Sequence, residues 1–262
     1  MRWLILFLLF PLHALAEERL EVDVELFLAV DLSRSMSPDE IEIQRRGYAE
    51  ALSSDEVWGA INNGLIGRIA ITYVEWAGEY AHRVVVPWTL IQTRDDARTI
   101  AQTIRTTASD GMQRTSISGA LLYAADSIEA NAFNGLRRVI DISGDGPNNQ
   151  GRPVLRARDA VLAKGIIING LPLMTQDTLS RIWDLPDLDE YFRRCVIGGP
   201  GAFVIPVYDW SQFADAIKRK LVLEISSLPE QVIPVQLRQL PPYDCLIGEK
   251  TWERNRPLFD LP

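Results

Sequence analysis

Three oxygen-bearing side chains, those of Asp31, Ser33 and Ser35, lie two residues apart at the end of a mostly apolar run. The run, residues 24–30, has the composition of a strand that is buried on both faces. In an extended chain, residues i, i+2 and i+4 point the same way, so these side chains can converge on one point. One carboxylate and two hydroxyls suit a hard divalent cation such as Mg²⁺. The alternative is an ordinary polar loop, because Asp and Ser are common loop residues.

Two further polar loops offer donors of the same kind. Asp145 lies between two glycines, directly after a short buried strand that we predict at residues 138–142, and Thr115 precedes a helix that begins near Ile117. In open α/β sheets, ligands bind at the carboxyl ends of the strands. The three loops together supply two carboxylates and three hydroxyls.

Apolar periodicity predicts strands that alternate with helices. We expect strands at residues 24–30, 68–76, 82–88, 138–142, 166–173 and 202–207, and helices at 37–52, 93–104, 117–128, 153–164, 187–194 and 211–225. Only a few residues around Gly78 separate the second strand from the third, which makes that pair antiparallel. The pattern predicts an α/β fold, a doubly wound, mostly parallel central sheet of about six strands with one antiparallel edge strand and helices on both faces.

The chain divides into three parts. Residues 1–16 combine a basic residue, an apolar core and Ala14-Leu15-Ala16, which is typical of a secretory signal peptide. A membrane anchor is the alternative, although the apolar run is short for a span. We expect residues 17–226 to form the domain and the Pro-rich residues 227–262 to be an extension that is packed on it or trails from it. No other segment is apolar enough to cross a membrane, so we predict an exported protein, periplasmic or extracellular, with no integral membrane span.

Composition and charge exclude several functions. The formal net charge of −8 argues against nucleic acid or an anionic membrane as the main partner, because both need a basic face. Removal of the signal peptide leaves His82 as the one histidine, which excludes a histidine-rich zinc site. We expect His82 at the surface beside a hairpin turn. The two cysteines, Cys195 and Cys245, favour a disulfide in an oxidising compartment, and two unrelated buried thiols are the alternative.

The three loops resemble those of von Willebrand factor type A (vWA) domains that carry a metal-ion-dependent adhesion site (MIDAS). That family has D-x-S-x-S after the first strand, a Thr before a helix, and an Asp in a T-D-G-like turn after the fourth strand. The resemblance covers roughly residues 22–226. It implies that the metal ligands are Asp31, Ser33, Ser35, Thr115 and Asp145.

Two residues near the Asp145 turn are unusual for their positions. Gly144 stands where the family usually has Thr, so it either eases the turn or loosens Asp145. Asp141 is unusual inside a buried strand, and we expect it either to hydrogen-bond near the site or to mark an exposed end of the sheet.

The resemblance also implies a function. In a stand-alone exported bacterial member of this kind, Mg²⁺ (with Mn²⁺ or Ca²⁺ as alternatives) would bind the hydroxyls directly and one or both Asp through water. The ion's open position would attract an outside carboxylate, so the implied partner is a protein that presents Asp or Glu. We expect a metal-dependent protein-binding or adhesion-type module of the cell envelope, not an enzyme. The alternatives are a Mg²⁺-assisted hydrolase, for which the chain shows no obvious base, and a structural envelope protein with a vestigial site.

Overall fold

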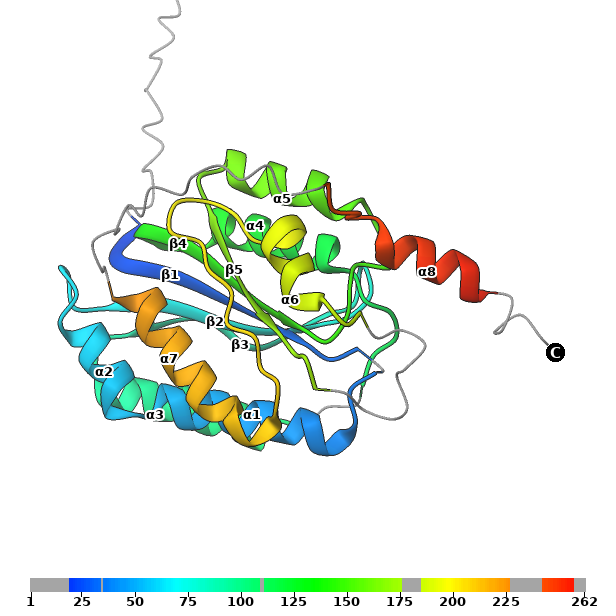
Figure 1. The fold of residues 1–262 in the computed structure, drawn as a ribbon. Helices are drawn as coiled ribbons and strands as arrows, with labels where there is room; N and C mark the ends of the chain where they lie inside the picture. Colours follow the sequence, from blue (N-terminus) through cyan, green and yellow to red (C-terminus); the bar gives the residue numbers. More distant parts are fainter. Residues whose placement is uncertain (1–18, 34, 109–110, 176–184, 227–241, 257–262) are drawn as a thin grey trace, which may run out of the picture.

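A five-stranded sheet forms the centre of the molecule (Figure 1). The computed structural model describes residues 19–33, 35–108, 111–175, 185–226 and 242–256. The strands, in the spatial order β3-β2-β1-β4-β5, are β1 (Leu20–Asp31), β2 (Ile69–Trp76), β3 (His82–Ile91), β4 (Phe133–Gly144) and β5 (Ile167–Pro172). All neighbours are parallel except β2 and β3, so the predicted mostly parallel sheet with one antiparallel edge strand is confirmed.

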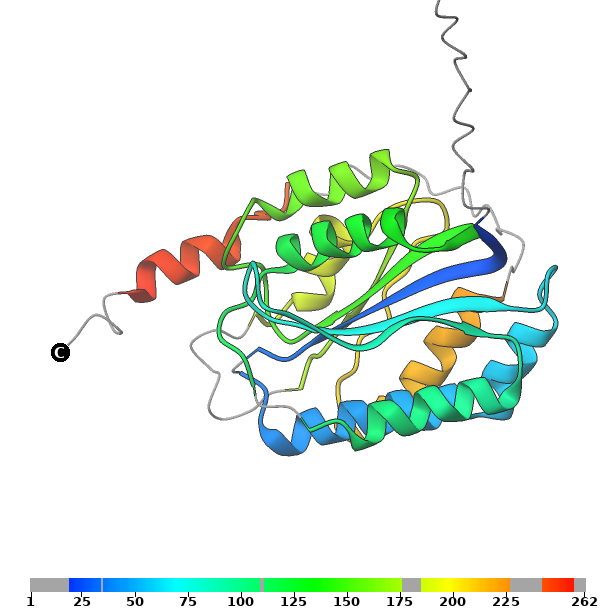
Figure 2. The same ribbon diagram turned by 180° about the vertical axis from the view of Figure 1, so that it is seen from behind.

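Helices cover both faces of the sheet (Figure 2). One face carries α1 (Pro38–Leu52), α2 (Asp55–Asn62), α3 (Arg94–Thr106) and α7 (Phe213–Ile225). The other carries α4 (Ile117–Ala130), α5 (Val154–Ala163) and α6 (Leu188–Tyr191), which continues as a π-helical turn, Phe192–Val196. The last helix, α8 (Ile247–Asn255), follows the predicted domain.

The central strand β1 is buried from both sides, as its apolar run predicts. Leu26, Leu28 and Val30 belong to the core that the strands share with α1, α3 and α7. Phe27 and Ala29 point the other way, into the core beneath α4 and α5. Both faces of β1 are packed and both of its edges are hydrogen-bonded. The strand therefore fixes the position of Asp31 at its carboxyl end.

The expected sixth strand, residues 202–207, is wrong as a strand, although this segment does run beside β5. Gly170 N–H donates to Phe203 O at 3.1 Å, and Val207 N–H donates to Pro172 O at 3.0 Å. Between these bonds a regular ladder needs an N–H at position 172, and proline has none. Only two isolated bridges remain, Gly170–Val204 and Leu173–Val207, and the sheet therefore has five strands.

The Asp141 carboxylate fits neither of its two expected roles. It is fully buried in β4, and Lys220 Nζ from α7 lies 2.8 Å from its Oδ1. The same Lys220 contacts Glu224, whose Oε1 also accepts a hydrogen bond from Asn169 Nδ2 at 3.0 Å. Asp141 is thus part of a buried ionic cluster between β4 and α7, and the sequence alone did not pair these residues because they lie 79 positions apart (220 − 141).

The disulfide between Cys195 and Cys245 is confirmed, with 5.5 Å between the two Cα atoms. It ties the segment that carries α8 to the π-helical turn after α6. Helix α8 itself was not expected, since residues 227–262 show no clear apolar periodicity. The predicted signal peptide, residues 1–16, and residues 227–241 of the extension lie outside the described residues. Within the described ranges, no helix has the length and apolar character needed to span a membrane.

Candidate metal site

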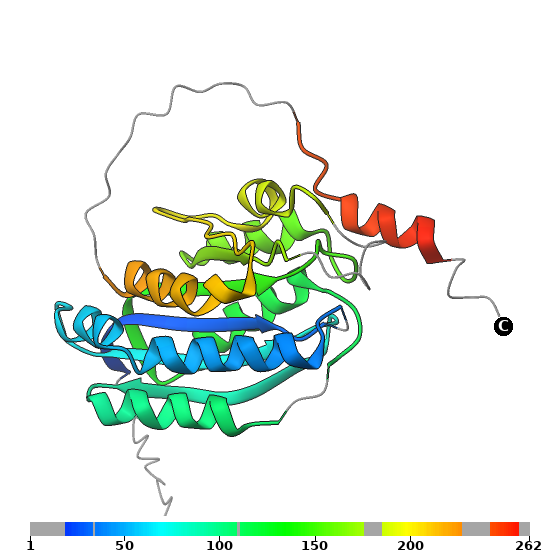
Figure 3. The ribbon, with the colours of Figure 1, turned by 60° about the horizontal axis from the view of Figure 1, so that its bottom comes forward.

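The three polar loops meet at the carboxyl ends of β1 and β4 (Figure 3). These neighbouring parallel strands lead in opposite directions: β1 continues into α1 on one face, and β4 continues into α5 on the other. The strand order reverses at this point, which is where open α/β sheets bind their ligands.

The first loop is folded tightly around Asp31. Ser33 N–H donates to Asp31 Oδ1 at 2.7 Å, and the hydroxyls of Ser33 and Ser35 lie 2.9 Å apart. The loop ends at α1, where Ser37 and Glu40 form a capping box: Ser37 N–H donates to Glu40 Oε2 at 2.7 Å. The Asp31 side chain is therefore held by a backbone N–H of its own loop, and the Ser33 hydroxyl by the side chain of Ser35.

Asp145 approaches this loop from β4. Its N–H donates to Asp31 Oδ2 at 3.3 Å, and Ser33 Oγ donates to Asp145 Oδ1 at 3.4 Å. The structure thus brings four of the five predicted residues into one hydrogen-bonded cluster, namely Asp31, Ser33, Ser35 and Asp145.

Thr115 joins the site through its backbone. Met112 N–H donates to Leu32 O at 2.8 Å, which draws this loop against the first one. Asn149, four residues after Asp145, accepts from Thr115 N–H at 3.1 Å and donates its own N–H to Thr115 O at 2.9 Å. Among the described residues, no side-chain hydrogen bond joins the Thr115 hydroxyl to the other four.

The electrostatics of the site are unfavourable without a cation. Burial raises the pKa of Asp31 well above its usual range, and the nearby charge of Asp145 raises it further. Burial also raises the pKa of Asp145, with an added contribution from the charge of Glu40. No Lys or Arg of the described residues forms an ion pair with either carboxylate.

Gly144 leaves room for the Asp31 carboxylate. A Cβ added at Gly144 would lie 3.3 Å from Asp31 Oδ2 and 3.5 Å from the Trp76 ring, which is tighter than ordinary contact at the first atom. Its φ is not positive, so a glycine is not needed for the turn. A side chain at this position would press on Asp31, whereas the backbone conformation does not require glycine.

Three residues that support the site loops by hydrogen bonds to their backbone were not predicted from the sequence. Gln44 Nε2 donates to Asp31 O at 3.2 Å, Ser143 Oγ accepts from Asp31 N–H at 3.3 Å, and Asn149 fixes Thr115. The one signal in the sequence was Asn148-Asn149, a pair of short amides directly after the Asp145 turn.

The donor set fits a hard cation and not a histidine- or cysteine-rich metal site. In the part of the chain that the structure describes, no group of three or more His, Cys, Asp or Glu side chains is arranged so that it could hold a metal ion. Half-buried His82 stacks on Tyr123 with 4.4 Å between ring centroids, and burial lowers its pKa. A cation at the candidate site would rest on two carboxylates and on hydroxyls, ligands that Mg²⁺ and related ions prefer.

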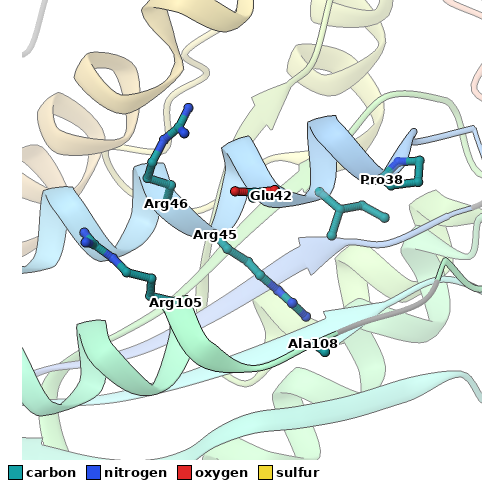
Figure 4. A pocket seen from close by; sticks show the side chains of 7 residues that line it. Pro38, Glu42, Arg45, Arg46, Arg105 and Ala108 are labelled. Carbon is teal, nitrogen blue, oxygen red and sulfur yellow. The ribbon is translucent and has the colours of Figure 1, made fainter.

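A cavity of about 350 Å³ lies between α1 and α3 (Figure 4). Arg45 extends from α1 toward Ala108 along it, but its donors are engaged: Nε and Nη2 contact Glu75 Oε1 at 2.9 and 2.6 Å, and Nη1 donates to Thr107 O. Arg83 binds the other oxygen of Glu75. Arg45 therefore belongs to a buried structural ion pair with Glu75, and its guanidinium is not free to bind an anion.

Solved structures with this fold include metal-binding and adhesive proteins. Proximal thread matrix protein 1 from the mussel byssus, with a zinc-occupied MIDAS motif, has a TM-score of 0.54 at 16% identity over 79% of this chain and 49% of its own. The pilus adhesin SpaC from Lactobacillus rhamnosus GG has a TM-score of 0.59 at 10% identity, covering 79% and 31%. The von Willebrand factor type A protein from Catenulispora acidiphila has a TM-score of 0.54 at 14% identity, covering 78% and 43%.

These likenesses and the sheet define the fold as that of a vWA domain. The chain spans half or less of the length of these solved structures. Over residues 21–229 it matches the family model described as "Protein of unknown function (DUF1194)", and it belongs to that family. No curated protein matches the sequence.

Proposed function

We propose that this protein is a metal-dependent protein-binding module in which a divalent cation, Mg²⁺ first, bridges the domain to a carboxylate of a partner protein. The observation that carries the proposal is the convergence of Asp31 and Asp145 with two hydroxyls at the switch point of the sheet. Burial raises the pKa of both carboxylates, and no Lys or Arg of the described residues forms an ion pair with either. A bound metal would remove that penalty.

The donor types determine what the ion would do. Hydroxyls are neutral ligands, so Ser33, Ser35 and Thr115 would leave the ion with most of its charge, and Mg²⁺ keeps several exchangeable water positions. An Asp or Glu side chain of a partner would replace one of these waters. SpaC, which has a similar fold, is a pilus adhesin, and adhesion is the kind of function proposed here.

Export to the periplasm or the cell exterior belongs to the same proposal. The Cys195–Cys245 disulfide supports it, because such bonds persist in oxidising compartments. No observation favours the hydrolase alternative: the one histidine of the mature chain stacks on Tyr123, and no hydrogen bond between described residues links it to Asp31 or Asp145.

A pull-down from envelope extract tests the proposal. The wild-type protein is expected to retain a protein partner when millimolar Mg²⁺ is present. It is expected to release that partner when a chelator is added. Asp31→Ala bait is expected to retain none, whereas Asp39→Ala, an exposed acid in the first turn of α1, is the matched control and behaves as wild type. Partners held equally well by all three baits with chelator present would contradict the proposal.

A further inference from the structure

The C-terminal segment, residues 242–256, lies against the loops that form the candidate metal site. Figure 1 shows α8 at the end of the molecule where β1 and β4 terminate. Two of its side chains reach two different loops of the site, and a disulfide holds it in place. The segment thus joins loops that come from separate parts of the chain.

The first contact is with the loop that follows Asp145. Asn148 is fully buried, and its Nδ2 donates to Glu249 Oε1 at 2.8 Å. Helix α8 approaches the same residue closely with its backbone: a Cβ added at Gly248 would lie 2.0 Å from Asn148 O. The neighbouring Asn149 makes the two backbone-linked bonds to Thr115. Any displacement of this loop therefore moves the support of Thr115.

The second contact is with the residue before Thr115. Arg114 has φ 75°, the one positive φ among the non-glycine residues that the structure describes. A residue with a Cβ adopts this conformation only when its surroundings hold it there. The Arg114 guanidinium lies over the Trp252 ring of α8 at 3.5 Å from the centroid, a cation–π contact that can supply this restraint.

The segment depends on its covalent anchor for its position. Helix α8 has nine residues, too few to be stable alone in water. Cys245, two residues before it, is bonded to the buried Cys195, and Tyr243 OH donates to Asp187 Oδ2 at 3.1 Å. The disulfide therefore sets where Glu249 and Trp252 can act.

We infer that the C-terminal segment is a positioning element of the metal site, in which Trp252 and Glu249 hold the Thr115 and Asp145 loops in the geometry that binds the ion. This inference rests on the proposed function. None of these residues is a metal ligand; they act through Arg114 and Asn148 on the loops that carry Thr115 and Asp145.

The test compares Mn²⁺ affinity and loop protection in the full mature chain. Trp252→Ala is expected to weaken Mn²⁺ binding, measured by calorimetry, by about tenfold, the lower end of what outer partners of metal ligands usually contribute. Hydrogen exchange in the metal-free protein is expected to accelerate at residues 112–119 and 145–150 and to stay unchanged in β1. Trp252→Phe, which keeps an aromatic face, restores both, and Glu253→Ala, exposed on the same helix, changes neither.

Two further variants keep the outcome decisive. Glu249→Ala and the double variant Cys195→Ser/Cys245→Ser are expected to shift affinity and exchange in the same direction as Trp252→Ala. Wild-type affinity and wild-type exchange in all three would overturn the inference while leaving the proposed function intact. A wild-type protein that binds no Mn²⁺ would instead overturn the proposed function, and unchanged exchange in the variants would then overturn the positioning role as well.

Discussion

Two pairs of carboxylates lie inside this domain, Asp141 with Glu224, both buried, and buried Asp31 with half-buried Asp145, and their surroundings differ. Asp141 and Glu224 lie between β4 and α7 with Lys220 between them, 2.8 Å from Asp141 Oδ1. Asp31 and Asp145 lie at the strand ends and have no cation among the described residues. Glu75, with Arg45 and Arg83, follows the first pattern. In these clusters the chain supplies its own cation, whereas the buried Asp23 and Glu25 accept from backbone N–H groups and from Asn131 instead. At the strand ends two acids face each other, and we propose that this pair takes a cation from outside the chain.

The largest expected effect follows from removing the internal cation. Lys220→Met would leave Asp141 and Glu224 buried without a counter-charge, and breaking a buried ion pair from one side usually costs about 3–5 kcal/mol. We expect a loss of that size in the free energy of unfolding, measured by urea denaturation. Lys218→Met, on the same helix but at the surface beside Glu56 and Asp215, is the matched control and should cost about 1 kcal/mol or less. Equal losses in the two variants would mean that Lys220 does not compensate the buried acids.

An intermediate effect is expected at the candidate metal site. Gly144→Ala places a Cβ against Asp31 Oδ2, and overpacking of this kind costs about 1–3 kcal/mol. We expect weaker Mn²⁺ binding together with a lower unfolding free energy, measured by calorimetry and urea denaturation. Gly146→Ala, where an added Cβ meets nothing within 4 Å, should leave both unchanged. The same Mn²⁺ affinity in both variants would show that the space beside Asp31 is not needed.

The third expected effect concerns pH and is small for each pH unit. Burial raises the pKa of Glu224 to about 7, with the charge of Asp141 adding to the rise. Because the folded-state pKa lies above the unfolded one, the proton stabilises the folded protein fully below about pH 4.5, and this contribution is lost as the pH rises through 7. We expect the unfolding free energy to fall by at most about 1.4 kcal/mol per pH unit between pH 5 and pH 7, the limit for one proton.

Glu224→Gln removes that titrating proton and keeps an oxygen that can accept from Lys220 and Asn169. Its unfolding free energy, measured by urea denaturation across the same range, should vary less with pH than that of wild type. An unchanged slope in this variant would assign the pH dependence to another group.

The sequence predicted what depends on neighbours along the chain. Helix α1, the antiparallel strands β2 and β3 and the polar end of β1 all follow from local patterns, and the structure has them. Helix α2 was not among the predicted helices, although Ser54 caps it and its first turn is acidic. The strand predicted at residues 202–207 does not form, because Pro172 of the neighbouring β5 has no N–H to donate.

Contacts between distant segments could not be predicted in the same way. The pairing of Lys220 with Asp141 depends on which face of β4 meets α7, and that is a property of the assembled sheet. The bonds between Asn149 and Thr115, and the approach of α8 to Asn148, likewise join segments that no local pattern connects. The types of the site residues were therefore readable from the sequence, but the supports of the site were not.

The comparison between the two carboxylate pairs is tested most directly by titrating Mn²⁺ into the metal-free wild type, Asp31→Ala and Asp39→Ala in a calorimeter, with circular dichroism as a check of the fold. The expected result is one binding site in wild type and in Asp39→Ala, and in Asp31→Ala an affinity at least about tenfold lower, a loss of about 1.4 kcal/mol or more. Retained affinity in a folded Asp31→Ala protein, or no binding by wild type, would contradict the assignment of this pair to a cation from outside the chain.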